Sequence, residues 1–220
     1  MKQKPLIAEF IGTFALIFIG VGSIIVNHIS QGAVGLVGIA LAHGLTIAVM
    51  ASATGAISGG HLNPAVTIGL FCTQKIDAAS ALRYVIAQCL GAISAAAMLK
   101  LCLPYDAIIS VHMGTPMLAE NVSIIQGLLI EIVLTFFLMF VIYGTAVDKR
   151  APQVGGLFIG LTVTLDIFMG GPITGAAMNP ARHLGPALLG GGLENIWLYW
   201  VGPIIGAVLA AVCYHNFLTE

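Results

Sequence analysis

Charged side chains are scarce in this sequence. Eight Lys and Arg and nine Asp and Glu occur among 220 residues, or 8%, whereas about a quarter of a soluble domain is charged. Hydrophobic residues make up 59% and the mean hydropathy is +1.03. This balance excludes a soluble globule and indicates an integral membrane protein. The net charge of -1 offers no basic face for nucleic acid, so we expect no nucleic-acid partner.

Cysteine and enzyme motifs are equally sparse. The four cysteines have irregular spacing, which favours neither a metal cluster nor a disulfide framework, and we interpret them as small buried hydrophobic residues. We find no Ser/His/Asp grouping, no H-E-x-x-H motif and no phosphate-binding glycine loop. We therefore expect neither an enzyme nor a cofactor. The cysteines are Cys72, Cys89, Cys102 and Cys213.

Long apolar runs dominate what remains. A membrane-spanning helix takes about 20 apolar residues, and helices are favoured over a barrel because the runs lack ten-residue alternation. The first run opens like a secretory signal, but Glu9 interrupts it and no A-x-A site follows, which indicates a retained span. Six spans are predicted, at about residues 5–27, 33–53, 81–103, 122–147, 154–171 and 195–217.

The basic residues predict the orientation of these spans. Most of them lie at the start of the chain, after the second span and after the fourth, which are three places on one side of the membrane. The positive-inside rule makes that side cytoplasmic, with both termini inside. The small size and short ends favour a prokaryotic plasma membrane. The residues concerned are Lys2, Lys4, Lys75, Arg83, Lys149 and Arg150.

The chain repeats itself internally. A shift of about 116 residues aligns Ile57-Ser-Gly-Gly-His-Leu-Asn-Pro-Ala65 with Ile173-Thr-Gly-Ala-Ala-Met-Asn-Pro-Ala181, and a shift of about 122 aligns Glu9 with Glu131. Each half then holds three spans. Because three is odd, the halves lie upside down to each other, as in inverted-repeat membrane proteins. We expect one domain over residues 1–220, with repeats of about 1–110 and 111–220.

Each repeat carries an Asn-Pro-Ala segment that is too short and too rich in glycine for a full span. Asn is a strong N-cap and Pro suits the first helical position, so each segment predicts the start of a short helix. Two such half-helices entering from opposite faces bring their positive N-terminal ends together at the membrane centre. There the side chains of Asn63 and Asn179 could donate hydrogen bonds to a passing oxygen, while a cation would be repelled.

These residues resemble the aquaporin (major intrinsic protein) family over nearly the whole chain. The resemblance rests on two Asn-Pro-Ala motifs at matched repeat positions, with Arg182 directly after the second. It implies a right-handed bundle of six transmembrane helices and two re-entrant half-helices, a pore in each protomer and a homotetramer. Further matching stretches are Ala8-Glu-Phe10, Ser58-Gly-Gly-His-Leu-Asn-Pro-Ala-Val-Thr67, Gly175-Ala-Ala-Met-Asn-Pro-Ala-Arg182 and Gly185-Pro-Ala187.

The resemblance also implies a selectivity constriction, formed by His43, Ile167, Ala176 and Arg182. In orthodox water channels the first position is Phe and the second is His, so this set is more similar to the plant vacuolar aquaporins. Ile and Ala should widen the neck and leave one wall apolar, which would admit ammonia or urea beside water. The alternatives are a structural Arg182 tied to loop carbonyls and a His43 satisfied by helix backbone.

Two buried acids, Glu9 and Glu131, stand at matching repeat positions and need hydrogen-bond donors. The N–H groups of the kinked loops before the half-helices are candidates, and the resemblance favours this scaffold role over a proton relay. His61 is expected to line the cytoplasmic vestibule, with bracing of the loop as the alternative.

Other polar residues leave their roles open. Asp166, near the predicted outer end of span five, is either a helix-end partner or a partner of the filter groups. His183 departs from both branches of the family and could act as a pH-sensitive gate. Val49 and Val163 are expected to contribute to an apolar pore wall.

The sequence predicts a passive channel for water, open to small neutral solutes such as ammonia or urea and closed to protons and ions. One alternative is a glycerol or small-solute facilitator. A secondary transporter with inverted repeats is another, although the spans hold almost no ion-coordinating acids beyond Glu9 and Glu131. A non-conducting adhesive tetramer would keep the same motifs.

Overall fold

The fold is a bundle of helices, described here by a computed structural model for residues 3–151 and 154–219. No strand occurs within these two ranges. The helices, in chain order, are α1 (Lys4–Ala15), η1 (Leu16–Val21), α2 (Gly22–Ile29), α3 (Gly35–Ser58), α4 (Pro64–Cys72), α5 (Ala78–Cys102), α6 (Tyr105–Ser110), η2 (His112–Gly114), α7 (Ile124–Ile142), η3 (Tyr143–Val147), α8 (Gly155–Thr174), α9 (Pro180–Gly190) and α10 (Ile196–Phe217).

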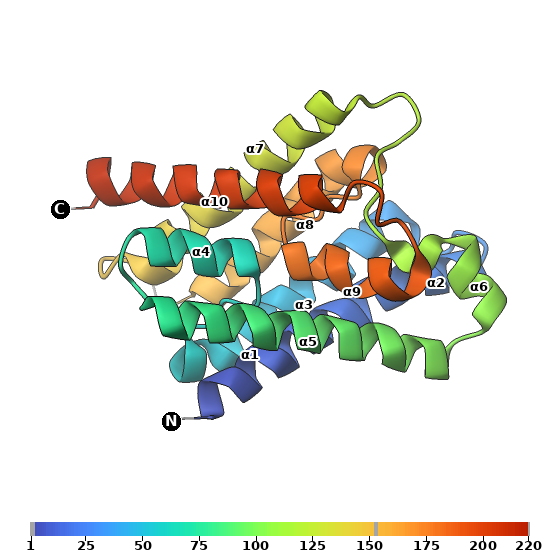
Figure 1. Cartoon of the computed structure of the whole chain (residues 1–220), viewed down its shortest axis with the longest axis horizontal. Coiled ribbons are helices and arrows are strands. Elements are labelled where there is room, and N and C mark those ends of the chain that lie inside the picture. Colours follow the sequence, from blue (N-terminus) through green and yellow to red (C-terminus); the bar gives the residue numbers. More distant parts are fainter. Residues whose placement is uncertain (1–2, 152–153, 220) are drawn as a thin grey trace.

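Six of these helical segments are long and apolar enough to cross a membrane, as the sequence predicts. Both ends of the chain lie at the same end of the bundle in Figure 1, which we call the terminal face. An even number of crossings requires this arrangement. The segments are Lys4–Ile29, Gly35–Ser58, Ala78–Cys102, Ile124–Val147, Gly155–Thr174 and Leu198–Phe217.

The two Asn-Pro-Ala segments begin short helices. Asn63 caps α4 and Asn179 caps α9, each in an extended conformation with a proline directly after it. In Figure 1, α4 and α9 lie end to end between α10 and α5, with their N-terminal ends toward the middle of the bundle. This is the pair of half-helices that the repeat predicts.

Two spans contain a wider helical turn that the sequence analysis does not anticipate. Residues Leu16–Val21 and Tyr143–Val147 are π-helical. Such turns cost helical hydrogen bonding and are frequent at functional sites. In η1, a side chain on Gly20 would collide with the ring of His43, so this turn and its glycine leave room for that histidine.

Glycines also set the distance between the main helix pairs. Gly44 and Gly160 meet where α3 crosses α8, and Gly91 lies against the backbone of Phe10 in α1. Gly206 of α10 lies against Ile132 of α7 in the same way. Small residues let helix backbones approach closely in lipid, where the hydrophobic effect does not drive helices together.

The interpretation of the cysteines as buried residues is wrong. Cys72 and Cys102 are exposed, Cys89 and Cys213 are half-buried, and all four are free. They face the outside of an apolar bundle, where a small side chain is tolerated without being enclosed. Among the described residues, no group of three or more His, Cys, Asp or Glu side chains could hold a metal ion.

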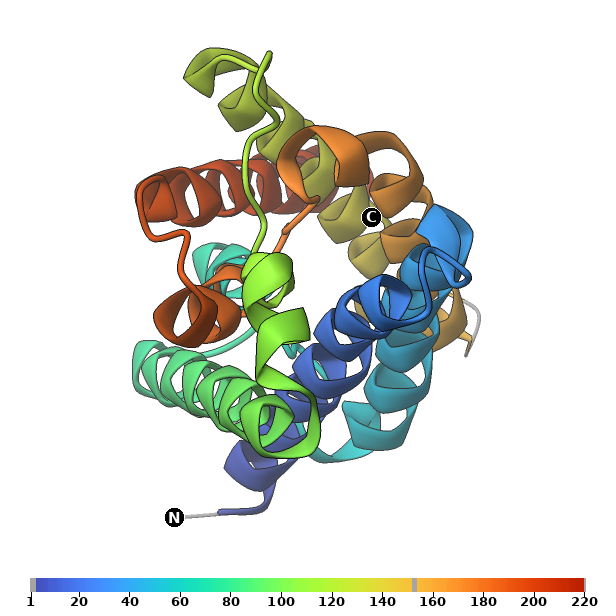
Figure 2. The same cartoon turned by 90° about the vertical axis from the view of Figure 1, so that its right-hand side faces the viewer.

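The end of the bundle opposite the termini is partly closed by a connection. In Figure 2, viewed along the bundle, the spanning helices form a ring, and α6 with the segment after it lies across the middle. Met113 in this segment is fully buried with a positive φ of 52°. This connection therefore reaches the interior, where it meets the candidate site.

Candidate functional site

A cavity of about 620 Å³ lies inside the bundle. Its lining residues come from both repeats and from both half-helix segments. At one end it reaches His43 and Arg182, and at the terminal face it reaches Lys75 and Lys149. The seven residues predicted for the pore centre, the selectivity constriction and the vestibule all line it: His43, His61, Asn63, Ile167, Ala176, Asn179 and Arg182.

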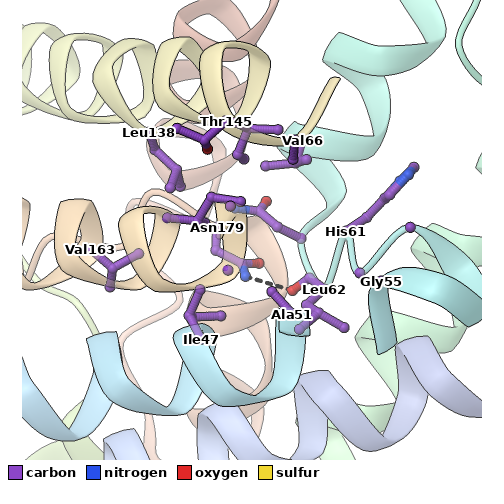
Figure 3. Close-up of a pocket in the computed structure, with 18 of the residues that line it drawn as sticks. Ile47, Ala51, Gly55, His61, Leu62, Val66, Leu138, Thr145, Val163 and Asn179 are labelled. Atoms are coloured by element: carbon purple, nitrogen blue, oxygen red, sulfur yellow. Dashed lines mark hydrogen bonds between the residues drawn. The ribbon is translucent and has the colours of Figure 1, made fainter. Parts of the chain in front are cut away.

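The two asparagines link the repeats at the middle of this cavity. Asn63 Nδ2 donates to Met178 O over 2.8 Å, and Asn179 Nδ2 donates to Leu62 O over 2.9 Å. Figure 3 shows the second of these bonds. Each Oδ1 meanwhile accepts from its own helix start, at Ala65 N and at Ala181 N. A carboxamide has two N–H bonds, so each asparagine keeps one donor for a molecule in the cavity.

Glu9 is enclosed by donors from the first loop. Its Oε1 accepts from Ser58 Oγ at 2.6 Å and His61 N at 3.0 Å, and its Oε2 accepts from Leu62 N at 2.6 Å and Gln88 Nε2 at 2.7 Å. The side chain is fully buried. These bonds satisfy both the carboxylate and the loop N–H groups that no helix can satisfy.

Glu131 makes the matching set of contacts in the second half. Its Oε1 accepts from Thr174 Oγ1 at 2.7 Å and Ala177 N at 3.0 Å, and its Oε2 accepts from Met178 N at 2.8 Å. A pair of tyrosines repeats as well, because Tyr84 donates to Ser58 O and Tyr199 donates to Thr174 O. The two halves thus hold their loops by the same chemistry.

Four residues surround the cavity at the end away from the termini. His43 Nδ1 lies 2.9 Å from Ile39 O and therefore donates to it, which leaves Nε2 as an acceptor without a partner in the described chain. Arg182 Nη1 donates to Gly114 O over 3.0 Å. Ile167 and Ala176 are buried and apolar. This end therefore presents a cation, an acceptor nitrogen and an apolar wall.

His61 has both a lining position and a hydrogen-bond partner. Its Nδ1 lies 3.1 Å from Thr67 Oγ1, and its ring packs edge-on against Tyr84 with centroids 5.1 Å apart. Gln88 Nε2 donates to both Thr67 Oγ1 and Glu9. His61 therefore combines the two expected roles, because its ring lines the cavity and also makes contacts that brace the loop.

The remaining wall is mostly apolar and follows helical spacing. Ile159, Val163 and Ile167 recur every four residues on α8 and all line the cavity. Val49 does not belong to this wall, contrary to expectation, because its side chain is 63% exposed on the outside of α3. It follows the lining residue Ile47 by two positions, which turns it to the opposite side of the helix.

Two polar residues are buried away from the cavity. Asp166 lies within α8, eight residues before its last residue Thr174, and not at the outer end as expected. Its Oδ2 has no partner in the described chain. His183 is fully buried and stacks on Tyr199 with centroids 4.3 Å apart. Neither residue is among those that line the cavity.

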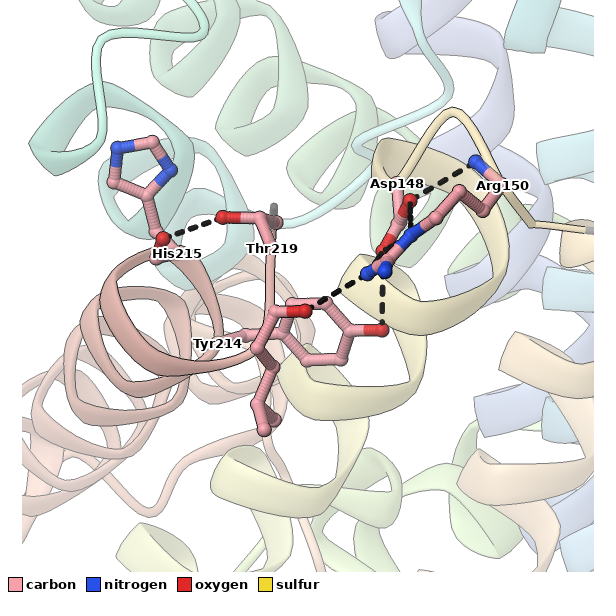
Figure 4. A network of polar contacts seen from close by, with 6 residues as sticks. Asp148, Arg150, Tyr214, His215 and Thr219 are labelled. Carbon is pink, nitrogen blue, oxygen red and sulfur yellow. Dashed lines mark hydrogen bonds and ion pairs between the residues drawn. The ribbon is translucent and has the colours of Figure 1, made fainter.

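A polar cluster borders the cavity mouth at the terminal face (Figure 4). Arg150 Nη2 donates to Asp148 Oδ2 at 2.6 Å and to Leu218 O at 2.8 Å, and Tyr214 OH donates to Asp148 at 3.5 Å. The hydrogen bonds from Arg150 hold the pKa of Asp148 at about 2. The cluster ties the segment between η3 and α8 to the end of α10.

Several contributing groups escaped the sequence analysis. Gly114 O receives Arg182, Gln88 bridges Glu9 and Thr67, and Thr13 Oγ1 donates to Leu62 O. A glutamine in the middle of an apolar span is itself a signal, because such a side chain needs partners. A backbone carbonyl carries no signal of this kind in the sequence.

The fold and cavity define a membrane channel of six spanning helices whose interior is crossed by two half-helices meeting at their N-terminal ends. The family model named "Major intrinsic protein" matches residues 1–214. The chain therefore belongs to the major intrinsic protein family, that is, the aquaporins. Members of this family are passive channels and not enzymes.

The chain is similar to members of the family from a plant and a mammal and to a solved structure. It is 44% identical to Aquaporin TIP4-4 of Zea mays, covering 96% of this chain and 85% of that protein. It is 43% identical to Aquaporin-4 of Mus musculus, covering 96% of this chain and 66% of that protein. The solved aquaglyceroporin of Plasmodium falciparum matches with a TM-score of 0.85 at 27% identity, covering 98% of this chain and 96% of that chain. None of these organisms supports the expected prokaryotic membrane.

Proposed function

We propose that the protein conducts water in single file, together with small neutral solutes such as ammonia or urea, and excludes protons and ions. The observation that carries this proposal is the cavity lined by Asn63, Asn179 and the four residues predicted for the selectivity constriction. Apolar walls offer a passing water few hydrogen bonds, so each water moves quickly between a small number of polar groups.

The centre of the cavity rejects cations in this mechanism. The N-terminal ends of α4 and α9 each carry about half a positive charge, and they face each other across the conduction path. The free N–H of Asn63 and that of Asn179 donate to the oxygen of a water at this point. A water whose oxygen is held this way turns its hydrogens outward, which interrupts a chain of proton transfer.

The neck at His43, Ile167, Ala176 and Arg182 sets solute size and adds a second barrier to charge. The hydrogen bond to Gly114 O holds the positive charge of Arg182 at the cavity wall. His43 Nε2 accepts a hydrogen bond from the solute. Ile167 is an aliphatic side chain at the position where the resemblance gives orthodox water channels a histidine ring. That difference is why the proposal includes ammonia and urea.

We further propose cytoplasmic termini, a homotetramer in the lipid bilayer, and one domain built from repeats of about 1–110 and 111–220. Basic residues at the terminal face support the orientation. The matched contacts of Glu9 and Glu131 support the repeats. Family membership supports the tetramer, which chemical cross-linking in vesicles would test.

Stopped-flow light scattering on proteoliposomes tests the proposed solutes. With an impermeant osmolyte, vesicles should shrink faster than protein-free vesicles. Urea and an ammonium gradient should each produce protein-dependent entry. A water rate equal to that of empty vesicles would refute the channel proposal, and water flow without either solute would restrict it to water alone.

A second candidate is a glycerol facilitator. The similarity to a solved aquaglyceroporin favours it, as does the aliphatic Ile167 at the neck. Against it, His43 and Arg182 place two polar groups on the cavity wall, which suits water better than a carbon backbone. Protein-dependent glycerol entry at a rate comparable to water in the same vesicles would favour the facilitator.

A further inference from the structure

A second hollow lies on the outside of the bundle, between α1 and α5. It is a groove of about 360 Å³ that lies near the terminal face. In Figure 1, α1 and α5 run side by side from this end. The groove is lined by apolar side chains and one basic residue: Leu6, Ile7, Phe10, Arg83, Ile86, Ala87 and Leu90.

The apolar part of this groove faces the surroundings. Ile7 is 54% exposed, Ile86 51% and Leu90 52%. All three belong to spanning segments, so they lie at the depth of the hydrocarbon chains of a membrane. Where α5 crosses α1, Gly91 touches the backbone of Phe10 and closes the groove on the side away from the terminal face.

Arg83 supplies a positive charge at the other end. It is the sixth residue of α5, so it lies roughly 8 Å along the axis from the helix start, at 1.5 Å per residue. Its side chain is exposed. No carboxylate within residues 3–151 and 154–219 forms an ion pair with it. An arginine at this depth extends toward the interface, where phosphate groups lie.

The inverted repeat offers an internal comparison. Tyr84 and Tyr199 make the matching hydrogen bonds of the two halves and stand 115 residues apart, and the same shift places Leu198 at the position of Arg83. Leu198 is fully buried and packs with Ala177 and Tyr199. The second half therefore buries an apolar residue at the position where the first half exposes a cation. The basic groove is specific to one leaflet, and the repeat symmetry does not require it.

We propose that this groove binds one anionic glycerophospholipid from the leaflet at the terminal face. An acyl chain lies along Ile7, Ile86 and Leu90, and the phosphate accepts hydrogen bonds from the guanidinium of Arg83. Arginine donates to phosphate oxygens through two parallel N–H groups, and a second negative charge on the headgroup remains near the basic surface. The site is independent of the conduction path, which it does not touch.

Native mass spectrometry of the detergent-solubilised protein tests this site. The protein is incubated with equal amounts of phosphatidylglycerol and phosphatidylcholine that carry identical acyl chains. A surface arginine favours an anionic lipid over a neutral one by roughly five-fold. The wild type should therefore retain roughly five times as much phosphatidylglycerol as phosphatidylcholine. Arg83→Gln should retain the two lipids about equally. Lys100→Gln, which alters the same helix near the opposite face, is the matched control and should keep the wild-type ratio.

Two further arms separate lipid from other occupants. Inorganic phosphate should not displace the bound lipid, and the double change of Ile7→Ser and Leu90→Ser should reduce retention of both lipids. Displacement by phosphate would identify a free-anion site instead. Disulfide cross-linking of Ile7→Cys to Leu90→Cys between two copies in vesicles would mean that a second copy covers the groove. Either result, or an unchanged ratio in Arg83→Gln, overturns the proposal. Arg83→Gln should keep wild-type water permeability, which shows that it folds.

Discussion

At the scale of single residues, the charge of Arg182 can be tested directly by substitution. Its guanidinium is held by Gly114 O at one end of the cavity. A unit charge acting over about 4 Å at an effective dielectric constant near 20 contributes roughly 4 kcal/mol. Removing the whole of this barrier corresponds to about a thousand-fold, so Arg182→Val should raise proton permeability by up to that factor, while water permeability persists. A pH-sensitive dye trapped in proteoliposomes measures the leak, and a proton-tight variant would contradict the assigned charge barrier.

Glu9 tests a structural role at the same scale. The change Glu9→Ala leaves the two loop N–H groups of His61 and Leu62 without an acceptor. Each buried unsatisfied group costs about 1–3 kcal/mol, so we expect these two groups to cost about 2–6 kcal/mol together. Thermal unfolding in detergent measures this loss. Glu9→Gln, which keeps one acceptor oxygen, should have a stability between that of Glu9→Ala and that of the wild type. Equal stability of Glu9→Ala and wild type would contradict the scaffold role.

The sequence predicts those residues whose type is unusual for their surroundings. An acid at Glu9, an arginine at Arg182 and two Asn-Pro-Ala motifs are conspicuous in an apolar chain. The contact between Gly114 O and Arg182 was not predictable. Every residue has a carbonyl group, and only the path of the connection between the third and fourth spans places this one beside Arg182. Val49 was misplaced because four-residue spacing from His43 selects Ile47 instead, and hydrophobicity alone does not distinguish the two faces of a membrane helix.

At the scale of helices, the α3 and α8 crossing depends on glycine. A Cβ added at Gly160 would lie 2.6 Å from Ala48 Cβ and 2.7 Å from Ala48 N. The backbone cannot yield without separating the helices, so Gly160→Ala should destabilise the protein by about 1–3 kcal/mol. Gly55 lies on the same α3 with open space around it, and Gly55→Ala is the matched control that should cost little. Thermal unfolding in detergent compares the two, and equal midpoints would contradict the packing argument.

The extents of helices were predictable and their local irregularities were not. Hydrophobic length defined all six spans to within a few residues, because the bilayer sets how long a spanning helix must be. The π-helical turn at Leu16–Val21 contains Gly20, which lies against the ring of His43, a residue far from it in the chain. A local pattern in span one holds no information about a ring that arrives from span two.

At the scale of the whole molecule, the cluster around Asp148 joins the connection between the fourth and fifth spans to the end of the last. The pKa of Asp148 is held at about 2, below its usual value near 4. A lowered acid pKa stabilises the fold above the unfolded value and loses this effect only as the pH falls through about 2. The link should thus stay intact from about pH 5 to 8. Hydrogen exchange of the amides near Asp148 should be unchanged by pH once corrected for intrinsic rates, and faster in Asp148→Asn.

The centre of the channel exists only when both halves are folded together. Asn63 donates to Met178 O in the other repeat, and Asn179 donates to Leu62 O. Both hydrogen bonds join the same two loops, so loss of one bond allows the loops to move and weakens the other bond. Combining Asn63→Ala with Asn179→Ala should therefore give a free-energy change that departs from the sum of the single changes by about 0.5–3 kcal/mol.

The two tyrosines supply the comparison for this coupling. Tyr84→Phe and Tyr199→Phe each remove one hydrogen bond to a loop carbonyl, but each bond stays within its own half. With no partner in common, these two changes should add to within about 0.5 kcal/mol. Unfolding in mixed detergent micelles measures both cycles. If the asparagine pair were as additive as the tyrosine pair, the crossed hydrogen bonds would not couple the repeats, and the two half-helix segments would be held in place by their own halves alone.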